Sequence, residues 1–413
     1  MHSISSRPRL TLFLLAALSA LAFMDRQILA VLVVPLKAEF ALTDLQLGLV
    51  SGLAFSISFG IMALPLGRLA DRVERRRLVA WCRGLGGVLA ALGALAGSAW
   101  LLALTRCGSA LSDAGGAPAS MSMIADLYPP QNRAKAMGLF TMGATAGALL
   151  AMVGGAALAQ HLGWRTTLAI VGLMAVAAAV LFRACATEPT RQVLPSGAPA
   201  TDGVVRMLLA DPVARALVLA ASFALLAGYS FGAWNFAYLV RAMHLSPQQA
   251  GWISGLSALG SLVAAPLAGH LSDRVALAGP WRRLWVPIGG LALALPLAWA
   301  YLALPELSLW LAVVLVIAFS FFLAFWIAPV YAALSMVVAP QQRAQANAIL
   351  MLVGAVGGSG IGPVLTGALS DALVGHVAGD PLGVALALAV SMLLPAIATL
   401  GVALRAWQMR STA

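Results

Sequence analysis

Long apolar stretches separated by short polar segments run along most of this 413-residue chain. A helix needs roughly 20 apolar residues to cross the hydrocarbon core of a bilayer. Twelve stretches come close to or exceed that length, which predicts membrane-spanning helices over residues 10–35, 45–66, 78–98, 100–127, 135–160, 165–183, 212–240, 248–271, 284–303, 307–338, 345–371 and 382–405. The pattern therefore predicts an all-α polytopic membrane protein.

One polar interval is longer than the others and divides the chain. Residues 184–211 contain several prolines and glycines together with charged residues, a composition typical of a linker. Six predicted spans precede this interval and six follow it. We therefore expect an N-terminal six-helix bundle over residues 1–183, a cytoplasmic linker over 184–211, and a C-terminal six-helix bundle over 212–413.

Two charged segments of the first half return in the same order in the second half. The sequence GRLADRV begins at Gly67 and is matched by GHLSDRV from Gly269; PQNRAKA begins at Pro130 and is matched by PQQRAQA from Pro340. Generic arginine-rich loops would explain the charge but not the shared Gly, Asp and Pro positions. The repeats indicate an internal duplication, so the two bundles are expected to be pseudo-symmetric.

Composition and charge agree with a membrane protein. The chain is 62% hydrophobic and 9% charged, with a mean hydropathy of +0.95, which excludes an ordinary soluble domain. A net charge of +11 would suggest a nucleic-acid partner in a soluble protein. Here the arginines gather at the ends of alternate spans, as the positive-inside rule describes. We therefore expect no nucleic-acid partner, a location in the cell inner membrane, and both termini in the cytoplasm.

The N-terminus resembles a secretory signal, with Arg7 and Arg9 ahead of an apolar run. That run resumes after Arg26 and continues to Pro35, so we interpret it as an uncleaved first span. The three cysteines have no ligand spacing, and the sequence lacks Ser/His/Asp, HExxH and Walker patterns. We expect no metal site, no catalytic site and no cofactor.

Four charged residues lie deep inside predicted spans: Asp25 and Arg26 in the first, and Arg106 and Asp113 in the fourth. An intramembrane charge costs at least about 2.5–3.5 kcal/mol on insertion scales, so such residues usually have a partner or line a cavity. Arg106 and Asp113 are two helical turns apart and therefore share a face. Asp25 and Arg26 point about 100° apart and cannot pair along their own helix. A static ion-pair network is one interpretation of these four residues, and proton exchange is the other.

These motifs carry a family resemblance over the whole chain. The segment from Gly67 to Arg77 resembles the signature between the second and third helices of the major facilitator superfamily. Four further segments resemble the spinster branch of that superfamily: Met24 to Gln27, Ile124 to Arg133, Gly232 to Trp234, and Trp281 to Pro287. One departure is that Ser112 and Asp113 stand where the branch usually has Gly and Glu.

The resemblance implies a fold and roles for particular residues. It implies that helices one and four line a central cavity, so that Asp25, Arg26, Arg106 and Asp113 would surround one polar spot. It assigns proton coupling to Asp25 and Asp113, with Arg26 and Arg106 as their charge partners and the proton gradient as the driving force. A conformational latch across the two bundles is implied at four positions, namely Gly67, Asp71, Arg72 and Arg343.

Aromatic and polar residues mark the seventh and tenth spans, which correspond to the first and fourth. We expect six of them to line the substrate cavity: Tyr229, Trp234, Asn235, Tyr238, Trp326 and Tyr331. For any single aromatic residue, packing or an interfacial position is the alternative. A cavity with charge on one wall and aromatic rings on the other suits an amphipathic or anionic solute. The spinster resemblance adds lysolipids and sphingoid lipids as the substrate class.

The sequence therefore favours a proton-coupled secondary transporter that works as a monomer in the lipid bilayer by rocking of two bundles. An uncoupled facilitator or exchanger of organic anions with the same fold is one alternative. A receptor or membrane enzyme that keeps the fold without transport is another, although no appended domain or catalytic motif supports it.

Overall fold

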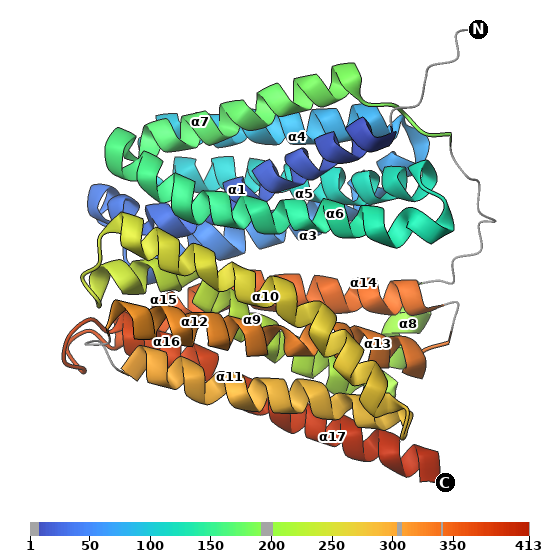
Figure 1. The fold of residues 1–413 in the computed structure, drawn as a ribbon. Coiled ribbons are helices and arrows are strands. Elements are labelled where there is room, and N and C mark those ends of the chain that lie inside the picture. The colour runs from blue at the N-terminus through green and yellow to red at the C-terminus, as the bar shows by residue number, and fades with distance from the viewer. Residues whose placement is uncertain (1–7, 191–200, 304–307, 340–341, 413) are drawn as a thin grey trace, which may run out of the picture. The chain divides into compact units, whose positions relative to one another are not determined.

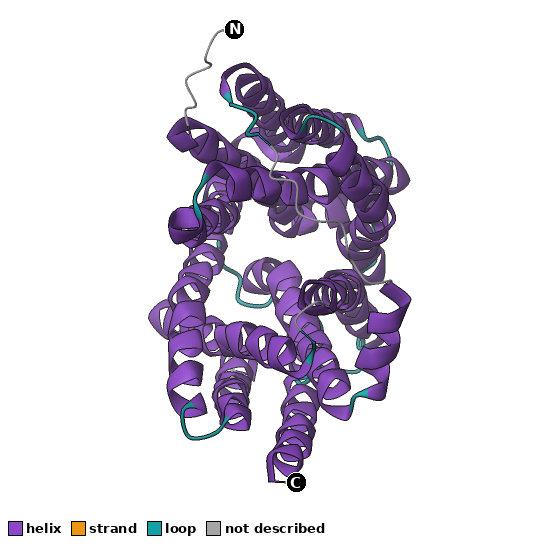
Figure 2. Cartoon of the chain, turned by 90° about the vertical axis from the view of Figure 1, so that its right-hand side faces the viewer, coloured by secondary structure: helices purple, strands orange, loops and turns teal. Residues whose placement is uncertain are grey.

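The structure is a computed structural model that describes residues 8–190, 201–303, 308–339 and 342–412. These residues form helices and connecting loops, with no strand among them (Figure 2). Within them, the helices pack as two compact units. The first takes the described residues of Met1–Leu194 together with Ser246–Gly255, and the second takes those of Pro195–Leu245 and Leu256–Ala413.

The expected spans of the first half correspond to helices of the structure (Figure 1). They are α1 (Pro8–Phe40), α2 (Asp44–Gly48) continuing into α3 (Ala54–Arg72), α4 (Arg75–Leu92), α5 (Ala99–Leu127), α6 (Pro130–Leu150) and α7 (Ala156–Cys185). Gly163 has a φ of 78° inside α7, so this helix breaks there. The break separates the fifth span from the sixth, because a left-handed residue favours glycine and interrupts the helix.

The second half repeats this arrangement after one additional helix. It comprises α8 (Thr201–Ala210), α9 (Pro212–Arg241), α10 (Pro247–Ala276), α11 (Trp285–Ala303), α12 (Leu309–Leu323), α13 (Ile327–Val337), α14 (Arg343–Gly354), α15 (Gly362–Ala372), α16 (Leu382–Val390) and α17 (Leu393–Thr412). Among the described residues, ten helical stretches are long and apolar enough to cross a membrane. The break at Gly163 divides one of them, and α5, which carries Arg106 and Asp113, completes the twelve expected spans.

Close helix packing through glycine holds α1 in the first unit. A side chain at Gly147 of α6 would place its Cβ 2.0 Å from the carbonyl oxygen of Ala20, and one at Gly143 would lie 2.3 Å from that of Ala16. Neither position can accept even a methyl group without moving a backbone. This Gly-x-x-x-Gly contact brings two helix backbones together, as is common in membrane proteins, and fixes the helix that carries Asp25.

The second unit has the same kind of close helix packing at glycines, between the equivalent helices. The end of α14 and the segment that joins it to α15 pack against α9. A Cβ on Gly358 would lie 2.8 Å from the ring of Tyr229, and one on Gly354 would lie 2.1 Å from Leu225. The same close packing in both units fits the duplication that the repeated charged segments indicate.

The predicted linker contains ordered structure at both of its described ends. Its last part forms α8, in which Val204 and Leu208 are buried. Its first part is held by Arg75, which lies at the start of α4 and is 2% exposed. The Arg75 guanidinium contacts Asp126 at 2.5 Å and Glu188 at 3.1 Å, and donates to the carbonyl of Pro189 at 3.0 Å. The Arg75 side chain therefore joins α4, α5 and the linker.

Candidate functional site

The first buried ion pair of the site joins α1 to α5. Nη2 of Arg106 lies 2.5 Å from Oδ2 of Asp25, and the two side chains are 4% and 11% exposed. Nη1 of Arg106 also lies 3.5 Å from the backbone carbonyl oxygen of Asp25. The other carboxylate oxygen of Asp25, Oδ1, is buried and has no hydrogen-bond partner among the described residues. This carboxylate therefore has one oxygen neutralised by arginine and one oxygen that can accept a proton.

The second buried ion pair joins α5 to α4. Nη1 of Arg83 donates to Oδ1 of Asp113 at 2.9 Å and to Oγ of Ser112 at 3.1 Å. The Arg83 side chain is 3% exposed, and its Nε is buried without a partner among the described residues. The serine that departs from the usual pattern of the branch thus helps to bind the arginine that neutralises its neighbour.

Two glycines make room for this second pair. A Cβ on Gly86 of α4 would lie 2.6 Å from the Cβ of Ser112, and a Cβ on Gly116 of α5 would lie 2.5 Å from Nε of Arg83. Contacts that short do not occur between real side-chain atoms, so any larger residue would displace the serine or the guanidinium. The two glycines allow α4 and α5 to approach closely enough for Arg83 to reach Asp113.

The expected arrangement of charges around one polar spot was wrong in its pairing. Arg106 and Asp113 do share α5, but Arg106 binds Asp25 on α1 whereas Asp113 binds Arg83 on α4. Seven residues of α-helix separate them by about 10 Å along the axis. Each acid therefore finds its cation on a neighbouring helix, and the site consists of two Asp–Arg pairs.

Arg26 contacts the aromatic rings of two phenylalanines. Its guanidinium lies 4.8 Å from the ring centroid of Phe55 in α3 and 5.9 Å from that of Phe23. Asp25 and Arg26 thus face different helices, as their angular separation along α1 predicts. Cation–π contact stabilises a partly desolvated guanidinium by roughly 0.5–2 kcal/mol.

The structure tests little of the predicted latch. The side chain of Asp71 lies outside the described residues, and Arg72 and Arg343 are exposed. A Cβ on Gly67 would have no neighbour within 4 Å among the described residues. The latch stays a prediction.

Three of the six residues expected to line a substrate cavity belong to the core of the second unit. Trp234 is 1% exposed and donates from Nε1 to the carbonyl of Pro363 at 3.0 Å. Asn235 accepts from the hydroxyl of Tyr301 at 2.7 Å, and Tyr238 donates to the carbonyl of Leu302 at 3.2 Å. These three side chains are packed inside the second unit in this structure, so their place in a substrate cavity stays a prediction.

The other three residues remain together on α9 and the tenth span. Tyr331 and Trp326 stack with ring centroids 6.4 Å apart, and Tyr229 lies near Tyr331. Both tyrosines are half-buried, whereas Trp326 is 4% exposed. Tyr229 and Tyr331 are therefore the residues of the predicted set with accessible surface for a ligand.

Sequence reasoning missed Arg83 and Tyr301. Arg83 offered a signal, since it is a charged residue inside the apolar span predicted over residues 78–98, but it was not among the candidate residues. Tyr301 had no comparable signal. It is fully buried and packs on Phe231 and Tyr238 at centroid distances of 5.9 and 5.6 Å, which only the tertiary structure reveals.

Charged residues buried between membrane helices are rare, and they commonly mark substrate, ion or proton pathways. A model of the Major Facilitator Superfamily matches residues 15–359 and 217–410 of the chain. The chain belongs to this superfamily. It is therefore a polytopic membrane transporter and not an enzyme, and among the described residues no cluster of His, Cys, Asp or Glu could hold a metal ion.

Curated relatives include exporters. The chain is 34% identical to an MFS-type efflux pump of Mycolicibacterium smegmatis over 384 residues, which cover 91% of this chain and 88% of the relative. It is 24% identical to a probable sugar efflux transporter of Helicobacter acinonychis over 261 residues, covering 62% of this chain and 65% of that relative.

Solved structures confirm the spinster-like branch. A bacterial homologue of the human lysosomal transporter Spinster, crystallised in an inward-facing and unoccupied conformation, matches with a TM-score of 0.86 and 25% identity, covering 97% of this chain and 98% of that one. A nucleoside transporter matches with a TM-score of 0.76 over 96% of this chain and all of that one, but at 16% identity this likeness concerns the fold alone.

Proposed function

We propose that this member of the major facilitator superfamily is a proton-coupled secondary transporter in which Asp25 and Asp113 carry the proton. The observation that supports the proposal is the pair of buried Asp–Arg contacts, together with the unpartnered Oδ1 of Asp25. Arginine does not release a proton in a protein, so the carboxylates are the groups that can titrate.

The chemistry follows from competition between burial and charge. Burial favours the protonated form of a carboxylate, and an adjacent guanidinium favours the ionised form. A modest movement of α5 relative to α1 or α4 would lengthen one Asp–Arg contact and change that balance. Protonation would then be linked to alternating access by rocking of the two bundles, and the transported solute would gain its driving force from the proton gradient.

The proposed substrate is a small amphipathic or anionic organic solute, including lysolipids and sphingoid-type lipids. Its charged head would interact with the arginines of the two pairs, and its apolar part with aromatic side chains such as Tyr229 and Tyr331. The relatives support an exported organic solute, since they are described as an efflux pump and as a homologue of a lysosomal transporter.

The test measures proton binding and proton-driven transport separately. Purified Asp25→Asn, Asp113→Asn and the double variant are compared with wild type for proton uptake after a pH step, and in proteoliposomes with an imposed pH gradient for uptake of lysolipids, sphingoid bases and organic anions. We expect both single variants to lose pH-driven transport while exchange survives in part. Asp113→Glu should retain activity, because it restores the acid that is usual in the branch.

Asp380→Asn provides the matched control. Arg241 binds Asp380 through two contacts of 2.7 and 2.9 Å in the second unit, so this variant also removes one carboxylate from a partly buried pair. Its pH dependence should remain that of wild type. Wild-type pH dependence in the Asp25→Asn, Asp113→Asn double variant would instead identify the network as structural, and the protein as an uncoupled facilitator or exchanger.

A further inference from the structure

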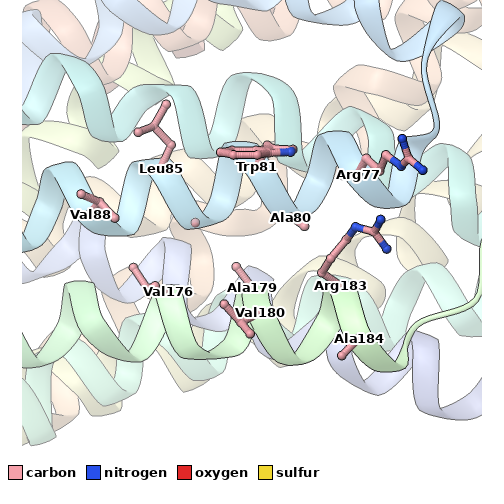
Figure 3. A pocket seen from close by; sticks show the side chains of 11 residues that line it. Arg77, Ala80, Trp81, Leu85, Val88, Val176, Ala179, Val180, Arg183 and Ala184 are labelled. Carbon is pink, nitrogen blue, oxygen red and sulfur yellow. The ribbon is translucent and has the colours of Figure 1, made fainter.

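A groove runs along the surface of the first unit between α4 and α7. It has a volume of about 760 Å³. Figure 3 shows its lining side chains, which come only from these two helices: Arg77, Ala80, Trp81, Gly84, Leu85 and Val88 from α4, and Val176, Ala179, Val180, Arg183 and Ala184 from α7. The groove lies apart from both Asp–Arg pairs, since none of their residues lines it.

The groove is apolar along its length and charged at one end. Small residues, Gly84 and Ala179, form its floor, while Trp81 and Val180 on its rim are 73% and 65% exposed. The sequence from Arg77 to Val88 spans about 16 Å of helix, which is about half of the roughly 30 Å hydrocarbon core of a bilayer. Its length therefore corresponds to an acyl chain of one leaflet.

The charged end contains an arginine, Arg183, that forms no ion pair with another described residue. Both carboxylate oxygens of Glu74 bind other arginines, Oε1 to Arg76 at 2.7 Å and Oε2 to Arg77 at 2.5 Å. Glu74 attracts Arg183 electrostatically, but among the described residues Arg183 has no ion pair. Its half-buried guanidinium lies at the same end of the groove as that of Arg77, on the facing helix (Figure 3).

Among the described residues at this end, the charges leave an excess of one positive charge. Four arginines (Arg75, Arg76, Arg77 and Arg183) face three acids (Glu74, Asp126 and Glu188). Arg75 is satisfied by Asp126 and Glu188, which leaves Arg183 as the cation available to an external anion. Guanidinium binds phosphate oxygens through charge-assisted and often bidentate hydrogen bonds.

We propose that this groove binds one anionic phospholipid of the surrounding bilayer. One acyl chain lies along Leu85, Val88 and Val176, and the phosphate contacts Arg183, with Arg77 beside it. Trp81 lies one helical turn from Arg77, where an indole ring at the membrane interface contacts the glycerol region. The positive-inside distribution predicts that this end faces the cytoplasm, where anionic headgroups attract basic pockets between transmembrane helices. The site is a lipid site of the first unit and does not depend on proton coupling.

The experiment measures lipid retention by the full chain in native mass spectrometry, with titrations of phosphatidylglycerol and phosphatidylcholine. We expect wild type to bind phosphatidylglycerol more tightly, and Arg183→Gln to weaken that binding roughly five-fold, since one basic residue near a membrane surface contributes about 1 kcal/mol. Binding of phosphatidylcholine should change little in this variant. Arg405→Gln, which alters an exposed arginine of the second unit, should leave both unchanged.

A second pair of variants tests the groove itself. Val180→Trp fills it from an exposed rim position and should weaken binding of both lipids, whereas Leu181→Trp alters an exposed neighbour that does not line the groove and should have no effect. Neither change enters the core, so folding is preserved. Equal phosphatidylglycerol affinity in wild type, Arg183→Gln and Val180→Trp would overturn the proposal, as would equal wild-type affinity for the two lipids.

Discussion

The pairing of Asp113 with Arg83 can be tested by a double-mutant cycle. Arg83→Met removes the cation and leaves the carboxylate of Asp113, which is 14% exposed, without its counter-charge. Breaking a buried pair on one side costs roughly 3–5 kcal/mol, so each of Arg83→Met and Asp113→Ala should lower the free energy of unfolding by an amount in that range. The double variant contains neither charge, and its loss should be smaller than the sum by about 2–3 kcal/mol.

A cycle on Arg106 provides the comparison. Because Arg106 and Asp113 are about 10 Å apart along α5 and bind different helices, Arg106→Met and Asp113→Ala should be additive to within about 0.5 kcal/mol. Arg106→Met and Asp25→Ala should couple as strongly as the Arg83 and Asp113 changes do, given their contact at 2.5 Å.

The measurement is the free energy of unfolding of purified protein in lipid bicelles, determined by steric trapping for each single and double variant. A coupling energy between Arg106 and Asp113 that equals or exceeds the one between Arg83 and Asp113 would refute the assignment of partners. Near-zero coupling in both cycles would show that neither arginine stabilises Asp113.

Two further predictions concern packing and pH. Gly147→Val should destabilise the first unit by at least about 1–3 kcal/mol, because a Cβ there would lie 2.0 Å from a backbone oxygen of α1. Gly138→Ala is the control and should not destabilise it, since a Cβ on Gly138 has no neighbour within 4 Å. Thermal unfolding of both variants checks this prediction. Burial raises the pKa of Asp211, but hydrogen bonds from Arg410 and from the backbone of α9 lower it more, so its pKa lies below the usual value. A lowered folded-state pKa gives stability that is present above the unfolded pKa near 4 and is lost as pH falls through the folded value. Asp211→Ala should therefore lower the free energy of unfolding by about 0.5–2 kcal/mol at pH 7, because it removes a helix cap. Its free energy of unfolding should fall less between pH 7 and pH 3 than that of wild type. An equal fall in the two proteins would contradict this prediction.

The apolar pattern by itself determined the spans, because a helix that crosses a bilayer must satisfy its own backbone hydrogen bonds and needs a minimum apolar length. The positions of α1, α5 and α9 follow the expected ranges closely, and the break at Gly163 falls where two spans were expected to meet. The sequence also indicated the internal duplication, because the short charged segments recur in the same order in both halves of the chain.

Only the tertiary structure decided which charges meet. Periodicity places Arg106 and Asp113 on one face of a helix, but an arginine side chain is long, and its partner depends on how closely neighbouring helices approach. Here Gly86 and Gly116 let α4 come close enough for Arg83 to bind Asp113. The burial of Trp234 could not be predicted for the same reason. It depends on α15 lying against α9, and the two helices are more than a hundred residues apart in sequence. Local patterns determine elements, whereas contacts between elements depend on packing that no single segment encodes.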